Sequence, residues 1–208
     1  MRLTSDTRLL ARCVASACLA VLILTAAVWA YPKPATVPYR WQLDFEPGEL
    51  RLYVDTAGEA AAYWYFTYKV TNRTGRDQVW APSFTVFTDG GEIMQSGRAV
   101  STRVADDIRD LLGNIFLETQ NEVIGDIFHG REHAKEGLVI WPAQNTDVNE
   151  ISLFIAGISG ETARVSNPIT NEQVLLRKTL HRDYLIRGDA LARGSKPAEL
   201  VRQQWILR

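Results

Sequence analysis

Short runs of alternating apolar and polar residues, separated by turn sequences, dominate the chain from Trp41 onward. The clearest are LRLYV at 50–54, YWYFTYKVTN at 63–72, SLFIA at 152–156 and LLRKTLHRDYLI at 175–186. Successive side chains of a strand point to opposite faces, so alternation of this kind marks strands that are buried on one face. At least about seven such runs predict an antiparallel β-sandwich over residues 41–208.

Turn and breaker residues mark the ends of these runs. Asn72-Arg73-Thr74-Gly75 is a turn sequence, because Asn and Gly tolerate the left-handed conformation. Pro47-Gly48 punctuates the first part of the domain, between WQLDF and ELRLYVD. Pro82 interrupts QVWAPSFTVFTD, and proline cannot donate to a strand ladder. We therefore expect an edge position or a β-bulge at Pro82.

One segment in the middle of the chain has helical periodicity. Five apolar residues recur at helical intervals in RVADDIRDLLGNIF: Val104, Ile108, Leu111, Leu112 and Ile115. This spacing predicts an amphipathic helix inserted into the β domain over about 103–125. Ile108, Leu111, Leu112 and Ile115 are expected to pack against the sheets.

The end of the chain also carries a helix-start signal. Ser195 is a suitable N-cap residue, and Pro197 suits the first turn of a helix. The sequence SKPAELVRQQWILR therefore predicts a short terminal helix.

The first thirty residues look like an export signal. Residues 13–30 contain no charge, and Arg2, Arg8 and Arg12 precede them. Cleavage after Ala30 would release a secreted protein. Because a run of this length only just reaches the roughly 17–25 residues that span a bilayer, an uncleaved membrane anchor stays open as the alternative. Both outcomes place the remainder outside the cytoplasm.

Residues 31–40, which begin YPKPATVPY, form a proline-rich linker between this leader and the domain. Such a segment favours extended polyproline conformation and predicts a semi-rigid spacer. Both cysteines, Cys13 and Cys18, lie in the leader. The exported domain must therefore be held by its core without disulfides.

The charge of the domain argues against a nucleic-acid partner. Three arginines and one aspartate lie in the leader, which leaves 20 basic and 23 acidic residues after Ala30. A nucleic-acid footprint normally needs a clustered basic face and a high domain pI. The expected partner is another protein of the cell envelope or the extracellular space, with the membrane contacted only through residues 13–30.

Four segments carry a resemblance to a known family: YKVTNRTGRD at 68–77, APSFTVFTDGG at 81–91, KEGLVIWP at 135–142 and EISLFIAG at 150–157. They resemble exported bacterial immunoglobulin-like sandwich domains, in which a strand ending in VTN precedes a strand with a P-x-F step. A later G-x-V-x-W/F-P strand then precedes a long apolar one. The resemblance covers about 41–189 without the helical insert, and it implies a fold but no activity.

The sequence HGREH at 129–133 spells the H-x-x-E-H motif of inverted zincins. On a helix, His129 and His133 would bind zinc and Glu132 would act as general base. Glycines at positions 125, 130 and 137 make a continuous helix unfavourable here. We expect a solvated loop and no metal or other cofactor, with a zinc-dependent hydrolase as the alternative function.

The densest aromatic cluster lies at 63–68. Alternation places Trp64, Phe66 and Tyr68 on one face of a strand, with Tyr63 and Tyr65 on the other. One face must be the core. The face of Tyr63 and Tyr65 could stack on a ligand, or it could pack beneath the inserted helix.

Three weaker motifs have simpler explanations. Arg187-Gly188-Asp189 matches an adhesion tripeptide but also reads as a turn at a strand end. Asp106, Asp107 and Asp110 lack the spacing of a calcium loop and suit the beginning of a helix. Asn72-Arg73-Thr74 is a formal glycosylation sequon within a turn.

No nucleophile motif is present after the leader: Gly157-Ile158-Ser159-Gly160 falls short of G-x-S-x-G, and there is no cysteine. His181, the third histidine, lies in an alternating run and is expected to be a surface or cross-strand residue. The sequence thus favours an exported, non-catalytic β-sandwich that binds an envelope component.

Overall fold

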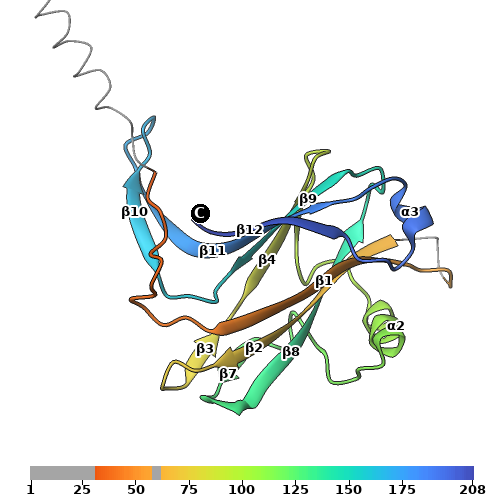
Figure 1. The fold of residues 1–208 in the computed structure, drawn as a ribbon, viewed down its shortest axis with the longest axis horizontal. Coiled ribbons are helices and arrows are strands. Elements are labelled where there is room, and N and C mark those ends of the chain that lie inside the picture. The colour runs from red at the N-terminus through yellow and green to blue at the C-terminus, as the bar shows by residue number, and fades with distance from the viewer. Residues whose placement is uncertain (1–30, 58–61) are drawn as a thin grey trace, which may run out of the picture. The chain divides into compact units, whose positions relative to one another are not determined.

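The computed structural model describes residues 31–57 and 62–208, which hold twelve strands, β1 to β12, and two helices, α2 and α3 (Figure 1). The predicted leader at 1–30 lies outside the described residues. Among the helices that are described, none is long and apolar enough to cross a membrane. The prediction of a mainly β domain is confirmed.

Four strands form the first sheet, in the order β1-β2-β8-β6. Their bounds are β1 Asp44–Val54, β2 Ala62–Asn72, β8 Gly130–Ala143 and β6 Glu118–Thr119. The pairs β1–β2 and β2–β8 are antiparallel, whereas the two-residue β6 runs parallel to β8.

Six strands form the second sheet, in the order β10-β11-β9-β4-β5, with β12 on the other side of β11. Their bounds are β4 Ser83–Thr88, β5 Ile93–Gln95, β9 Glu150–Ala156, β10 Thr162–Ser166, β11 Gln173–Leu185 and β12 Glu199–Leu207. A separate ribbon pairs β3, Gln78–Trp80, with β7, Gly125–Ile127.

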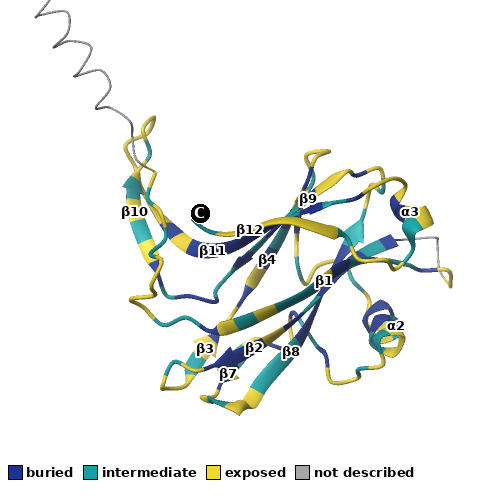
Figure 2. Ribbon diagram, viewed as in Figure 1, coloured by how far each residue is buried: buried dark blue, intermediate teal, exposed yellow. Residues whose placement is uncertain are grey.

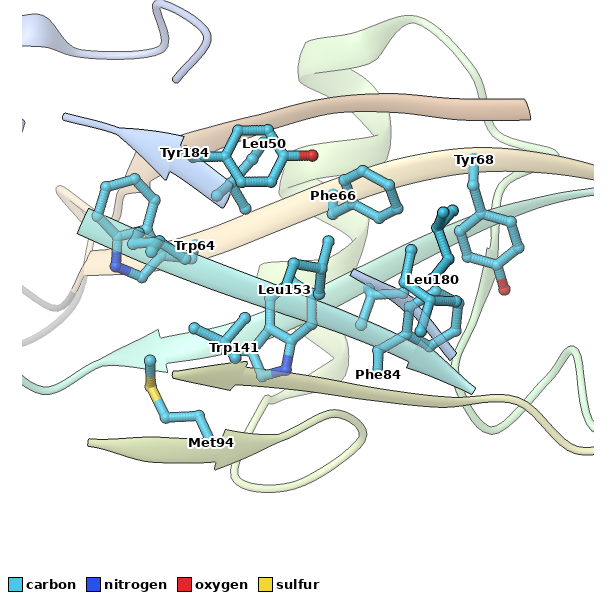
Figure 3. Close-up of a cluster of buried hydrophobic side chains, with 14 of the residues drawn as sticks. Leu50, Trp64, Phe66, Tyr68, Phe84, Met94, Trp141, Leu153, Leu180 and Tyr184 are labelled. Atoms are coloured by element: carbon cyan, nitrogen blue, oxygen red, sulfur yellow. The ribbon is translucent and has the colours of Figure 1, made fainter. Parts of the chain in front are cut away.

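The core lies between the two large sheets. Trp64, Phe66 and Tyr68 of β2 point into one apolar cluster, as their alternation predicts, together with side chains of β4, β9 and β11 (Figure 3). The ring of Phe84 from β4 lies 4.9 Å from Tyr68 and 6.4 Å from Phe66, measured between ring centroids. Aromatic packing across this gap therefore joins the two sheets.

The first strand is one element rather than two runs separated at Pro47-Gly48. β1 continues through these residues, with a register irregularity between Pro47 and Leu50. Such a β-bulge absorbs an extra residue without ending the pairing. A Cβ at Gly48 would lie only 2.3 Å from Oγ1 of Thr67 on the neighbouring strand, so this position has no room for a side chain.

Pro82 lies at a change of sheet. β3 before it belongs to the two-stranded ribbon, whereas β4 after it is an interior strand between β9 and β5. The predicted edge position is thus wrong for β4. The proline occupies the connection, where no ladder hydrogen bond is needed.

Helix α2, Thr102–Leu112, is shorter than predicted. The Ser101 side chain caps its first turn, and Gly113 ends it with a left-handed φ of 62°. The buried face is formed by Val104, Ala105 and Ile108. The prediction of a helical insert to about residue 125 is therefore wrong beyond Leu112.

Two of the apolar residues expected against the sheets are exposed. Leu111 falls at the margin of the buried face of α2 and is 55% exposed. Ile115 follows the end of the helix and is 71% exposed. Figure 2 shows α2 buried along one side only.

The predicted terminal helix is wrong. Residues 199–207 form β12 and pair with β11 from Lys178 to Leu185. Ser195 and Pro197 lie in the preceding connection, where the next N–H, that of Ala198, donates to the carbonyl of Leu50. A long antiparallel partner outweighs local N-cap chemistry. The short helix that does form nearby is α3, Ala190–Arg193.

Candidate functional site: the outward face of the six-stranded sheet

The outward face of the four-stranded sheet is covered by α2. Val104 and Ile108 of the helix form a second apolar cluster with Tyr65, Leu138 and Ile140 of the sheet. Tyr65 is only 1% exposed, and Tyr63 packs against the same cluster. The two tyrosines considered for ligand stacking therefore lie beneath the inserted helix.

The outward face of the six-stranded sheet is different. Within the described residues, neither helix packs on it. Its side chains form two rows across the strands, one of Phe87, Ser152, Asp183 and Arg202, the other of Thr85, Phe154, His181 and Gln204. We call this surface the open face. Figure 2 shows that most of β12, at one side of it, is exposed.

Three side chains of the open face form a stack. The rings of Phe154 and His181, on neighbouring strands, lie 4.4 Å apart and within 6° of parallel. The guanidinium carbon of Arg208 lies 4.0 Å from the centroid of the Phe154 ring. Phe154 is thus covered on the sheet by a cation and an imidazole, which accounts for its partial burial.

Asp183 holds together the polar part of the open face. It accepts hydrogen bonds from Oγ of Ser152 and from Nε of Arg202, both at 2.6 Å. Nε2 of His181 lies 2.8 Å from Oδ1 of Asp183. Although burial alone would raise the pKa of Asp183, the hydrogen bonds from Ser152 and Arg202 hold it below its ordinary value.

His181 has a lowered pKa. Burial is the largest cause, and the charges of Arg202 and Arg208 act in the same direction, against the carboxylate of Asp183. The imidazole is therefore neutral at pH 7. Ser152 directs its proton at Asp183, so the three side chains form a carboxylate-centred network rather than a hydroxyl activated by histidine.

A shallow groove of about 150 Å³ lies at one end of the open face. Its lining residues are Ser83, Thr85, Phe154, Ala156, Arg177, Thr179 and Arg208. Arg177 and Arg208 form its basic side, and the ring of Phe154 forms part of its floor. Sequence reasoning missed these residues because the tail was predicted to be a helix, which hid the pairing of Arg177 with Arg208.

The proline-rich segment after the leader is attached to the domain rather than free. Ala35 donates its N–H to Oε1 of Glu161 at 2.7 Å and accepts from Nζ of Lys178 at 3.0 Å. Lys178 and Glu161 form an ion pair of 2.9 Å with side chains only 2% and 4% exposed. Although burial alone would raise the pKa of Glu161, the hydrogen bonds from Ala35 and Lys178 lower it. The predicted spacer is therefore fixed at its middle.

The H-x-x-E-H motif lies at the start of a strand. β8 begins at Gly130, directly after His129, and continues through Glu132 and His133. Four residues of fully extended chain span up to about 13 Å between Cα atoms, whereas one helical turn would bring the two histidines together on one face. Nε2 of His133 lies 3.9 Å from Glu132. The described part of the chain holds no group of three or more His, Cys, Asp or Glu side chains placed to share a metal.

The adhesion tripeptide is engaged within the fold. Arg187 pairs with Glu199 at 2.6 Å. Oδ1 of Asp189 accepts from the N–H of Leu191 and caps α3. Gly188 has a φ of 77°, as the turn interpretation requires.

The remaining motifs are also accounted for by local contacts. Asp106 pairs with Arg109 and Asp107 with Arg103. The expectation that Asp106, Asp107 and Asp110 lie at the beginning of the helix is wrong, because α2 begins at Thr102 and its first turn holds no acidic residue. Asn72 is fully buried, and its Nδ2 donates to the carbonyls of Arg76 and Ile127. The amide nitrogen of the sequon is therefore not free to receive a glycan.

Comparison of the chain with protein-family models, with curated proteins and with solved structures finds no match.

Proposed function

We propose that this protein is an exported, non-catalytic binding module with an immunoglobulin-like β-sandwich fold. In this proposal it binds another protein of the cell envelope or the extracellular space through the open face. The observation that carries the proposal is the contrast between the two sheets: one outward face is covered by α2, whereas the other presents an ordered aromatic and polar surface.

Strand order supports the immunoglobulin-like assignment. That fold has one sheet of strands A, B, E and D and a second of C, F and G. When the strands receive their letters in the order in which they follow along the chain, the spatial order β1-β2-β8-β6 corresponds to A-B-E-D. The strands β4, β9 and β11 of the other sheet correspond to C, F and G, with β5 in the C′ position. β12 is an addition beside β11, and the parallel β6 is a departure from the usual antiparallel D strand.

We propose export on the basis of residues 1–30. The attachment of Ala35 to the domain limits the length of chain between the leader and the domain. Ala35 follows the end of the apolar run at Ala30 by five residues. An extended chain of that length spans at most about 18 Å. If the leader stays in the membrane, the domain begins close to the bilayer surface, where its partner would be an envelope component.

The proposal is tested by affinity capture from a solubilised envelope fraction with residues 31–208 as bait. Phe87→Asp places a charge on the open face, and Phe116→Asp places the same charge on an exposed site after α2. We expect one protein to be captured by the parent and by Phe116→Asp but not by Phe87→Asp. Equal capture by both variants would contradict binding through the open face.

A further inference from the structure

We infer that Arg177 and Arg208 together bind a carboxylate group of an acidic peptide segment in the binding partner. This inference rests on the proposed function and gives that partner a chemical identity. Its site is the groove at the end of the open face.

The two arginines are placed directly opposite each other on neighbouring strands. The N–H of Arg177 donates to the backbone oxygen of Arg208 at 2.7 Å, and the N–H of Arg208 donates to the carbonyl of Arg177 at 3.0 Å. A pair that exchanges both backbone hydrogen bonds has Cα atoms about 5.5 Å apart, with both side chains on the same face. Like charges in this arrangement destabilise a sheet.

No side-chain carboxylate of the described residues pairs with either guanidinium group, and the one carboxylate at the pair is the α-carboxylate of Arg208, an oxygen of which accepts the N–H of Arg177. Among the other arginines of β11, β12 and their connection, Arg202 pairs with Asp183 and Arg187 with Glu199, whereas Arg182 and Arg193 donate to neutral oxygens. Neither Arg177 nor Arg208 has an acidic partner within 4.0 Å in the described chain. Two guanidinium groups against one α-carboxylate leave a net positive charge at the groove, which favours a further oxyanion, because guanidinium groups bind carboxylates through paired N–H donors.

The surroundings orient one of the two cations. Arg208 uses the flat face of its guanidinium against the Phe154 ring, at 4.0 Å, and this contact leaves its N–H groups available at the edge. Thr179 and Ala156 complete a floor that is mostly apolar. An ion bound above such a floor is less screened than one on an open surface.

The size and location of the groove favour a peptide side chain. A volume of about 150 Å³ is well below the roughly 300–1,000 Å³ of a complete small-molecule site and suits one carboxyl group with a short stem. Among the described residues β12 pairs with β11 alone, so an extended segment can lie along its other edge beside Arg208. The domain has three more acidic than basic residues, which disfavours non-specific binding of polyanions.

The experiment is a calorimetric titration of residues 31–208 with hexaglutamate at low ionic strength, and with hexaglutamine as the uncharged control. We expect binding of hexaglutamate only, weakened at least tenfold in Arg177→Gln and in Arg208→Gln. Arg131→Gln, which removes an exposed arginine on β8, should bind like the parent. Equal affinity of the parent and the Arg177→Gln variant would overturn the inference.

Thermal unfolding without ligand gives a second readout. Because Arg177→Gln removes one of two opposed like charges, it should raise Tm at low salt, and the gain should shrink at high salt. A merely structural role for Arg177 would lower Tm instead. A decrease that is independent of salt would overturn the inference.

Two further measurements distinguish failure of the arginine site from failure of the proposed function. If inorganic phosphate raises the Tm of the parent as much as hexaglutamate does, and this requires Arg177, the assignment of a peptide carboxylate is wrong. If Arg177→Gln captures the envelope partner as well as the parent while Phe87→Asp does not, the proposed function stands and the arginine site falls. If neither substitution affects capture, both are contradicted.

Discussion

The outward faces of the two sheets differ in how their side chains avoid unfavourable contact with water. On the four-stranded sheet, Tyr65, Leu138 and Ile140 are apolar, and α2 buries them. On the six-stranded sheet, the corresponding positions carry Phe154 between a cation and an imidazole, with Asp183 fully engaged beside them.

The difference shows what allows a sheet face to remain uncovered. An apolar face must be removed from water, whereas a face whose polar groups are satisfied by one another can remain exposed. The open face meets this condition at Asp183, whereas the guanidinium groups of the opposed pair Arg177 and Arg208 have no side-chain carboxylate partner among the described residues. That pair is where a ligand would complete the surface.

The largest effect is expected from a substitution that disrupts the packing of α2 on the four-stranded sheet. Ile108→Asp places a charge in the buried apolar cluster beneath α2 and should lower the free energy of unfolding by more than about 3 kcal/mol. Urea denaturation measures this change. Ile115→Asp, at an exposed position after the helix, should leave the midpoint nearly unchanged. Equal effects of the two substitutions would mean that α2 does not cover the sheet.

The second effect concerns the six-stranded sheet, where β10 and β11 meet the segment at Ala35. Lys178→Met leaves the buried carboxylate of Glu161 without its cation and should cost about 3 kcal/mol. The double variant Lys178→Met with Glu161→Gln should recover part of this loss, because no charge then remains buried. No recovery in urea denaturation would show that the ion pair itself is not the source of the stability.

The third effect is a pH dependence that belongs to the open face. Because the pKa of His181 is lower in the folded than in the unfolded chain, protonation favours unfolding. The contribution of His181 is fully present above about pH 6.5 and is lost as the pH falls through the lowered folded pKa. Denaturation at pH 7.0 and 5.5 should therefore show a smaller loss of stability in His181→Asn than in the parent. An identical loss in both proteins would contradict the assignment.

The smallest effect is expected on the open face itself. Phe87 is 41% exposed, and Thr keeps the β propensity of the strand, so Phe87→Thr should change stability by no more than about 0.5 kcal/mol. Thermal unfolding measures the change. A loss as large as that of a core substitution would indicate that this face is buried by something outside the described residues.

The sequence was sufficient where one strong local pattern decided the outcome. Alternation placed Trp64, Phe66 and Tyr68 in the core, and the turn at 72–75 forms with Gly75 at a φ of 83°. Ile108 lies at the centre of the buried face of its helix, whereas Leu111 lies at the margin. Periodicity identifies a face but does not fix its limits, because these depend on how the helix sits on the sheet.

The sequence was insufficient where tertiary pairing decided the outcome. Ser195 and Pro197 are real helix-start signals, yet the residues that follow pair with β11. This register brings Arg208 opposite Arg177 and Gln204 opposite His181, across more than twenty residues of sequence. The candidate site therefore consists of cross-strand neighbours that no single segment could indicate.

The most direct test of the central claim is site-specific photo-crosslinking in cells. A photoreactive amino acid at position 204 lies on the open face, and the same group at position 115 lies on an exposed site after α2. We predict a discrete cross-linked adduct with an envelope protein from position 204, reduced by Arg177→Gln, and none from position 115. An adduct from position 115 and none from position 204 would contradict binding through the outward face of the six-stranded sheet.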